Sequence, residues 1–164
     1  MKSLKDWCST GLVVDTCVLA HSLNGPNKFN SSAIELMQHI LGDATICLIL
    51  DDTGKRSPNA ETSLLYSEYK RTLPPNSFPL VVLTRLLGSQ RVIFADRPSV
   101  SDRKKIAKLI PKNKKDRAVL GAAVSSIDRF LVSNDFDDFN ISVRSKVGKE
   151  LHVVVLSSDQ VYQE

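Results

Sequence analysis

The stretch Gly11-Leu-Val-Val-Asp-Thr-Cys-Val-Leu-Ala20 decides how the chain folds. Apolar residues run directly into the carboxylate of Asp15, and an apolar segment follows it. A run of this kind without helical amphipathicity predicts a buried strand of a parallel sheet, with Asp15 at its end. Because a lone buried carboxylate is costly unless it is paired or binds a metal, we interpret Asp15 as a metal ligand.

Strand-like and helix-like segments alternate along the rest of the chain. Further strands are predicted at residues 45–50, 92–95, 129–133 and 151–156, and helices at residues 31–42, 60–73, 78–87, 99–110 and 113–126. Alternation of this kind indicates an α/β protein with a parallel sheet covered on both faces. We expect a single domain over residues 1–164, a three-layer α/β/α sandwich around a mainly parallel four- or five-stranded sheet.

The composition is that of a soluble globular protein, with 42% hydrophobic and 24% charged residues. Asp15 interrupts the only apolar stretch that could serve as a signal core, and no apolar run approaches the roughly 20 residues needed to span a bilayer. Three widely spaced cysteines, Cys8, Cys17 and Cys47, favour buried thiols over metal or redox sites. The sequence therefore predicts a cytoplasmic protein without a membrane partner.

Positive charge is concentrated in one window of the chain. Between Arg103 and Arg117 the chain carries eight basic residues against one acid, Asp116, so this window has a net charge of +7 and the remainder −3. A concentrated positive patch favours a polyanionic partner such as nucleic acid. A solvated helix face beside a lysine-rich loop would give the same pattern.

Four carboxylates interrupt apolar patterns in the same way. Asp15 and Asp135 follow predicted buried strands, where ligands of open α/β sheets bind. Glu68 and Asp116 lie near the apolar faces of predicted helices. Each of three acids also has a purely structural interpretation. Asp116 could interact with the dipole at a helix N-terminus, Asp135 could cap a turn, and Glu68 could pair with an arginine.

Together the four acids predict a metal site. Clustered carboxylates repel one another, and hard divalent cations relieve that repulsion, so one or two Mg²⁺ or Mn²⁺ ions are the expected cofactors. With such ions the predicted chemistry is phosphodiester hydrolysis. His21, His39 and His152 are far apart in sequence and do not suggest a zinc site.

Four segments resemble the PIN-domain family in their order and spacing: Val13-Val-Asp-Thr-Cys-Val-Leu19, Ser67-Glu-Tyr-Lys-Arg71, Lys115-Asp-Arg-Ala-Val-Leu-Gly-Ala-Ala123 and Phe130-Leu-Val-Ser-Asn-Asp-Phe-Asp-Asp-Phe139. The resemblance covers nearly the whole chain. It implies an α/β/α sandwich and a Mg²⁺- or Mn²⁺-dependent ribonuclease.

The resemblance also implies roles for particular residues. Asp15, Glu68, Asp116 and Asp135 would be the acidic metal ligands, with Asp137 as a further acid. Thr16, Ser133 and Asn134 match small polar positions near the substrate. The segment 55–62 is longer than usual, which leaves Glu61 as a competitor for the role of Glu68.

The favoured hypothesis is an endoribonuclease whose Lys112, Lys114, Lys115 and Arg117 hold the RNA backbone. It would act alone or as the toxin of a toxin–antitoxin pair, with a small antitoxin protein as partner, and a homodimer is a further candidate assembly. The alternative is a catalytically silent PIN fold used as a binding or scaffold module. A haloacid dehalogenase-type phosphatase is disfavoured because Cys17 stands where that chemistry needs a second acid, and no Gly-rich loop suggests a nucleotide switch.

Overall fold

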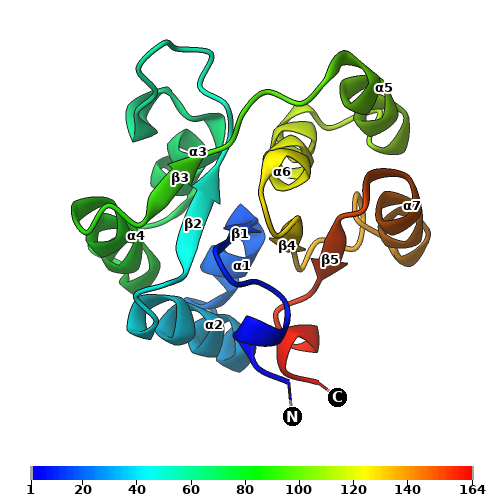
Figure 1. Ribbon diagram of the computed structural model, residues 1–164. Coiled ribbons are helices and arrows are strands. Elements are labelled where there is room, and N and C mark those ends of the chain that lie inside the picture. The colour runs from blue at the N-terminus through cyan, green and yellow to red at the C-terminus, as the bar shows by residue number, and fades with distance from the viewer. Residues whose placement is uncertain (1, 164) are drawn as a thin grey trace.

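A parallel sheet forms the centre of the computed structural model, which describes residues 2–163 (Figure 1). Within these residues the sheet has five strands: β1 (Gly11–Val14), β2 (Cys47–Leu50), β3 (Val92–Phe94), β4 (Phe130–Val132) and β5 (Val154–Leu156). Their order is β3-β2-β1-β4-β5, and every neighbouring pair is parallel. All carboxyl ends of the strands therefore lie at one edge.

Two layers of helices cover this sheet. The helices within residues 2–163 are α1 (Thr16–His21), α2 (Asn30–Gly42), α3 (Leu64–Thr72), α4 (Phe78–Gly88), α5 (Val100–Leu109), α6 (Lys114–Ser125) and α7 (Ile141–Leu151). Helix α6 packs on β1, β2 and β4, and α5 lies between α6 and α7, whereas α1 contacts α2 and α3 and α2 contacts α4. The predicted three-layer α/β/α sandwich is confirmed. No helix of residues 2–163 is long and apolar enough to cross a membrane.

Strand β1 lies at the centre of the core. Leu12, Val13 and Val14 are fully buried, as expected for a strand covered on both faces. Gly11 allows β2 to approach closely, because a Cβ atom there would lie 2.6 Å from the Cys47 carbonyl oxygen. The Asp15 N–H donates to the Val132 carbonyl oxygen at 2.9 Å, so pairing with β4 continues past the end of β1. This bond fixes Asp15 beside the end of β4.

The opening stretch is not one strand. The strand ends at Val14, next to Asp15 as expected, and Thr16–His21 forms α1, a helix that was not predicted. Asp15 is the N-cap of α1, with extended backbone (φ −68°, ψ 147°), and its carbonyl oxygen accepts the Val18 N–H at 3.0 Å. A helix of six residues is too short to display a 3.6-residue period, which explains why α1 was not predicted.

Other boundaries also differ from the sequence predictions. The expected helix at residues 60–73 is a short 3₁₀ turn, η2 (Ala60–Thr62), and then α3, because the Ser63 hydroxyl accepts the Tyr66 N–H and starts a new helix. Helix α7 was not predicted. The helix includes Leu151, which was predicted to begin the last strand. Strand β5 begins at Val154, after His152, whose backbone is left-handed. Two further 3₁₀ turns, η1 (Leu4–Asp6) and η3 (Gln160–Tyr162), lie near the termini.

The cysteines form no disulfide. Cys8 is buried, and Cys17 and Cys47 are partly buried. Burial is the main cause that raises the pKa of the Cys8 and Cys17 thiols to about 12, so both stay protonated near neutral pH. These two thiols are therefore poor nucleophiles and poor metal ligands, in line with the interpretation of structural thiols.

Candidate metal centre

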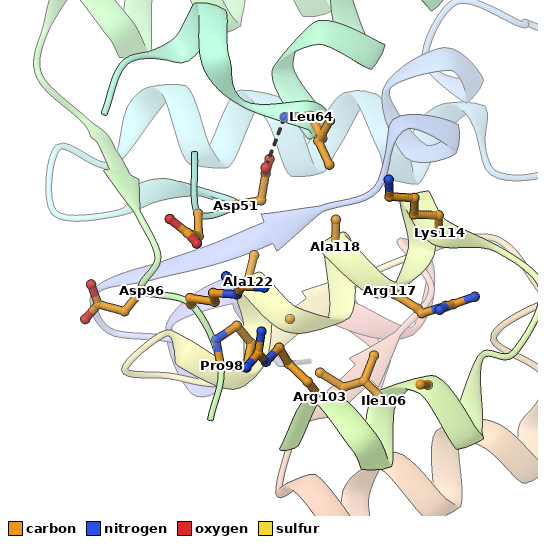
Figure 2. A pocket seen from close by; sticks show the side chains of 14 residues that line it. Asp51, Leu64, Asp96, Pro98, Arg103, Ile106, Lys114, Arg117, Ala118 and Ala122 are labelled. Atoms are coloured by element: carbon orange, nitrogen blue, oxygen red, sulfur yellow. Dashed lines mark hydrogen bonds between the residues drawn. The ribbon is translucent and has the colours of Figure 1, made fainter. Parts of the chain in front are cut away.

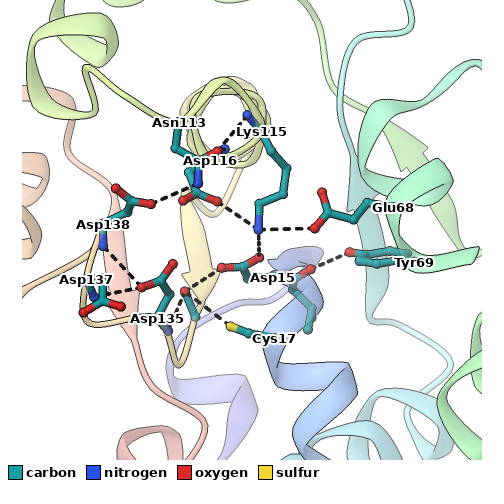
Figure 3. Close-up of polar contacts among 12 residues, drawn as sticks. Asp15, Cys17, Glu68, Tyr69, Asn113, Lys115, Asp116, Asp135, Asp137 and Asp138 are labelled. Carbon is teal, nitrogen blue, oxygen red and sulfur yellow. Dashed lines mark hydrogen bonds and ion pairs between the residues drawn. The ribbon is translucent and has the colours of Figure 1, made fainter. Parts of the chain in front are cut away.

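Three aspartates converge at the carboxyl edge of the sheet (Figure 3). Asp15 follows β1, Asp135 lies in the loop after β4, and Asp116 lies in the first turn of α6. One carboxylate oxygen from each lies within 4.8 Å of the others, so they could hold a metal ion. Asp15 and Asp116 are completely buried. Of the four acids predicted to converge, these three lie within metal-binding distance of one another, and Glu68 is not in the group.

Ser133 joins two of these aspartates. Its hydroxyl donates to Oδ2 of Asp15 at 2.7 Å and accepts the Asp135 N–H at 3.2 Å. Beneath Asp15, the hydroxyl of the buried Tyr69 donates to the Val14 carbonyl oxygen. Ser133 was predicted to contact substrate, but in the structure it positions Asp15 and the start of the Asp135 loop.

The backbone N–H of Asp116 is bonded within the helix cap, whereas its side-chain carboxylate accepts no hydrogen bond from residues 2–163. Oδ1 of the cap residue Asn113 accepts the N–H groups of Lys115 and Asp116 at 3.1 and 3.3 Å. As a carboxylate, Asp116 is buried and accepts no hydrogen bond at either oxygen within residues 2–163. The Lys115 ammonium lies 3.0 Å from Oδ1, but Oδ2 has no hydrogen-bond partner within residues 2–163, so this buried group favours a further cation or a proton.

The pKa of Asp116 reflects this environment. Burial raises it to about 7, the Lys115 ammonium opposes this rise, and the neighbouring Asp138 carboxylate supports it. Asp116 in turn lowers the pKa of Asp138, which accepts the Asn113 Nδ2–H at 2.9 Å. Asp138 was missed from the sequence because it stands in a loop, where no periodicity indicates which of two successive aspartates points inward.

Lys115 points into the cluster and not towards solvent. Its Nζ lies 3.0 Å from Asp116, 3.1 Å from Asp15 and 3.6 Å from Glu68 (Figure 3). Burial alone would lower the pKa of Lys115, but the Asp15 and Asp116 carboxylates raise it above the ordinary lysine value. Lys115 is therefore a charged internal counterion. The prediction that it holds the RNA backbone did not foresee this orientation.

Between the two competing glutamates, Glu68 is the one that faces the cluster. Its side chain is 17% exposed and lies opposite Lys115. Glu61, in the 3₁₀ turn η2 before α3, is 70% exposed and pairs with Lys70 at 2.6 Å. Glu68 does not belong to the group of three aspartates, and it contacts that group through the ammonium of Lys115.

The remaining residues predicted near the metal or the substrate, Asp137, Thr16 and Asn134, differ in burial and in their hydrogen bonds. Asp137 is exposed and lies outside the three-aspartate group, while its N–H donates to Oδ1 of Asp135 at 2.8 Å. The buried Thr16 hydroxyl has no hydrogen-bond partner within residues 2–163. The Asn134 amide is used inside the protein, next to His21 Nδ1 at 3.1 Å and accepting the Ser158 N–H at 2.8 Å. Asn134 therefore stabilises the fold around the site.

The predicted backbone-binding cations surround the start of α6. Lys112 and Lys114 are exposed, and Arg117 is partly buried and donates to the Pro111 carbonyl oxygen at 2.7 Å. Arg144, from the unpredicted α7, was missed. It donates to the carbonyl oxygens of Ser133 and Asp135 at 2.9 and 3.0 Å and so braces the Asp135 loop.

The cluster fits a hard divalent cation. Its donor atoms are carboxylate oxygens, the ligands that Mg²⁺ and Mn²⁺ prefer. Three carboxylates meet here, while Lys115 supplies a single positive charge to Asp15 and Asp116, so a metal ion would neutralise the remaining negative charge. Asp15, Asp116 and Asp135 are accordingly the residues that would hold it.

Comparisons with known proteins do not identify the chain: no protein-family model matches it, and no curated protein matches it. The resemblance to the PIN-domain family therefore stays a prediction from the four sequence segments and the positions of their acids.

Proposed function

We propose that this protein is a divalent-metal-dependent endoribonuclease of the PIN type, with Asp15, Asp116 and Asp135 as its metal ligands. The observation that carries the proposal is the convergence of three carboxylates, two of them fully buried, around the unsatisfied Asp116. A cluster of this kind destabilises the fold unless a cation relieves the repulsion, which favours a functional origin.

A Mg²⁺ or Mn²⁺ ion bound there would supply Lewis-acid catalysis of phosphodiester hydrolysis. The protein's own residues orient the ligands. Ser133 fixes the rotamer of Asp15, the Asn113 cap fixes the first turn of α6, and Arg144 fixes the backbone of the Asp135 loop. Such supporting contacts determine how well a site holds its metal.

The proposal that RNA is the substrate is based on the positive charge around the start of α6. The +7 window leads into the metal ligand Asp116, so Lys112, Lys114 and Arg117 stand beside the carboxylates and would hold the phosphates of a single RNA strand. Whether the enzyme acts alone or as a toxin with a small antitoxin partner stays a prediction, as does a homodimer.

One observation favours the alternative, a silent PIN fold. The Lys115 ammonium already neutralises part of the cluster, and it could hold the carboxylates together without a metal. A silent fold and a nuclease therefore differ in whether a divalent ion binds in the presence of Lys115.

The test is cleavage of single-stranded RNA in the presence of Mn²⁺. Asp15→Asn and Asp116→Asn should each lower the rate by more than about a hundredfold, since even supporting contacts of a metal site are worth 10–100-fold. Asp137→Asn, at an exposed acid outside the cluster, is the matched control and should cleave like the unaltered protein. Cleavage that persists in both cluster variants, or in excess EDTA, contradicts the proposal.

A further inference from the structure

A cavity of about 420 Å³ lies next to the metal centre, between α3, α5 and α6 (Figure 2). Its floor is apolar and includes Ile106, Ala118 and Ala122, with Pro98 from the β3–α5 loop. Pro98 lies directly against α6 because Gly121 has no side chain there; a Cβ atom would be 3.2 Å from Pro98 Cγ. This size and lining are typical of a small-ligand site.

The cations of this cavity have no carboxylate partners. Four of them line it: Arg97, Arg103, Lys114 and Arg117. None of the four forms an ion pair with an acid of residues 2–163. In addition, the buried Nε atoms of Arg103 and Arg117 have no hydrogen-bond partner in the described chain. Arginine and lysine side chains that line a cavity without an acid as partner favour an anionic ligand there.

Acidic residues of the cavity are placed differently. Asp51 is turned towards the start of α3, where its carboxylate accepts the Ser63 hydroxyl and the N–H groups of Leu64 and Leu65. In Figure 2, Lys114 and Arg117 lie at one end of the cavity, and Asp51, Asp96 and Arg103 lie towards the other. The cavity therefore has a positive end and an end of mixed charge with an apolar floor between them, which suits a nucleotide better than a polyphosphate.

The positive end adjoins the metal centre. On α3, Leu64 lines the cavity and Glu68, one turn later on the same face, faces the aspartate cluster. On α6, Lys115 points into the cluster and Ala118, one turn later, lines the cavity. One helical turn is about 5.4 Å, and α3 and α6 are in contact. A strand whose phosphate lies at the aspartates would bring its next nucleotide to the cavity.

We propose that this cavity binds one nucleotide of single-stranded RNA, the neighbour of the phosphate at the metal centre. Its phosphate contacts Lys114 and Arg117, and its base rests on Ala118, Ala122 and Ile106 with the Arg103 guanidinium against it. The Asp96 end offers an acceptor for a base N–H group. The inference rests on the proposed function, since it takes RNA as the substrate.

Binding is measured in the Asp116→Asn background, in which the strand stays intact. The probe is a short single-stranded RNA with 2-aminopurine at one position, followed by anisotropy for affinity and by base fluorescence for stacking. Arg103→Gln removes a cavity cation, and Ala118→Leu fills the floor. Each should weaken binding by about tenfold and reduce the change in 2-aminopurine fluorescence. Lys104→Gln, at the exposed neighbour on α5, is the control and should change affinity by less than about twofold.

The inference is overturned if both cavity variants bind the RNA as the Lys104→Gln control does, or if the 2-aminopurine signal is unchanged by them. Failure of the proposed function gives a different result. In that case the cavity variants still weaken RNA binding, but the protein with Asp116 restored does not cleave the strand with Mn²⁺.

Discussion

Two buried aspartates, Asp15 and Asp51, follow the neighbouring strands β1 and β2 at the same edge of the sheet, and their charges have different partners. Asp51 follows β2 and accepts three hydrogen bonds, from the Ser63 hydroxyl and the N–H groups of Leu64 and Leu65 at the start of α3. Asp15 follows β1 and accepts hydrogen bonds from the Ser133 hydroxyl and the Lys115 ammonium, but it lies next to Asp116, a second buried carboxylate that accepts no hydrogen bond from residues 2–163. Burial alone therefore does not distinguish a structural acid from a functional one.

The difference lies in how each charge is satisfied. Asp51 is neutralised by the protein's own donors at a helix N-terminus, an arrangement that stabilises the fold. The cluster of Asp15, Asp116 and Asp135 depends on Lys115 and, in our proposal, on a divalent ion. Removing charge should thus have opposite effects on stability at the two sites.

The largest effect is expected at Asp51. Asp51→Asn weakens the bonds to one oxygen and replaces the other oxygen by an NH2 group that cannot accept the remaining N–H, so it should lower the free energy of unfolding by about 3 kcal/mol. Urea denaturation measures it. Mn²⁺ binding by the folded fraction should stay unchanged, and a loss of Mn²⁺ binding here would remove the distinction between the two acids.

An opposite change is expected at Asp116. In the metal-free protein above pH 7, Asp116→Asn removes a buried charge that accepts no hydrogen bond and should raise the free energy of unfolding by roughly 2 kcal/mol. Some of the gain is offset by the lost ion pair with Lys115. Denaturation at pH 8 with EDTA measures the effect. A destabilised Asp116→Asn protein would mean that Lys115 satisfies this carboxylate.

The pH dependence of stability follows from the same group. The pKa of Asp116 is about 7 in the folded protein against 3.8 for an unperturbed aspartate, so the folded state holds an extra proton between these values. The contribution of Asp116 to the free energy of unfolding should therefore fall as pH rises from about 4 to about 7 and stay level above that. Urea titrations of the metal-free protein across this range should show that decline in the unaltered chain and not in Asp116→Asn.

A smaller effect is expected at Lys115. Its ammonium competes with a divalent ion for Asp15 and Asp116, so Lys115→Met should raise the affinity for Mn²⁺ by about tenfold. Isothermal titration calorimetry measures this, with Lys114→Met at the exposed neighbour as the control. Weaker Mn²⁺ binding by Lys115→Met would show that the lysine orders the carboxylates for the metal and does not compete with it.

The sequence predicted the layers of the fold and three of the acids because these follow from hydrophobic patterns. The apolar run before Asp15 and the run before Asp135 are strands, and strand ends share one edge of a parallel sheet. Helix α7 was missed since its residues are largely polar and its buried side chains are few, Val147 and Leu151 among them.

The hydrogen-bond and ion-pair partners of the buried charged residues could not be predicted in the same way. Asp15 and Asp51 both end apolar runs, and what separates them is Ser63, which stands far along the chain and caps a different helix. Lys115 follows the exposed Lys112 and Lys114 in a basic run, and the helix phase set by Asn113 turns it inward. Such contacts depend on tertiary packing and leave no local pattern.

The most direct test of the account is a calorimetric titration with Mn²⁺ of the unaltered protein, Asp116→Asn and Asp51→Asn, at a pH above 7. We expect the unaltered protein and Asp51→Asn to bind Mn²⁺ alike, and Asp116→Asn to show no binding. Equal binding by Asp116→Asn, or no binding by the folded unaltered protein, would contradict the claim that the three converging aspartates form a metal site.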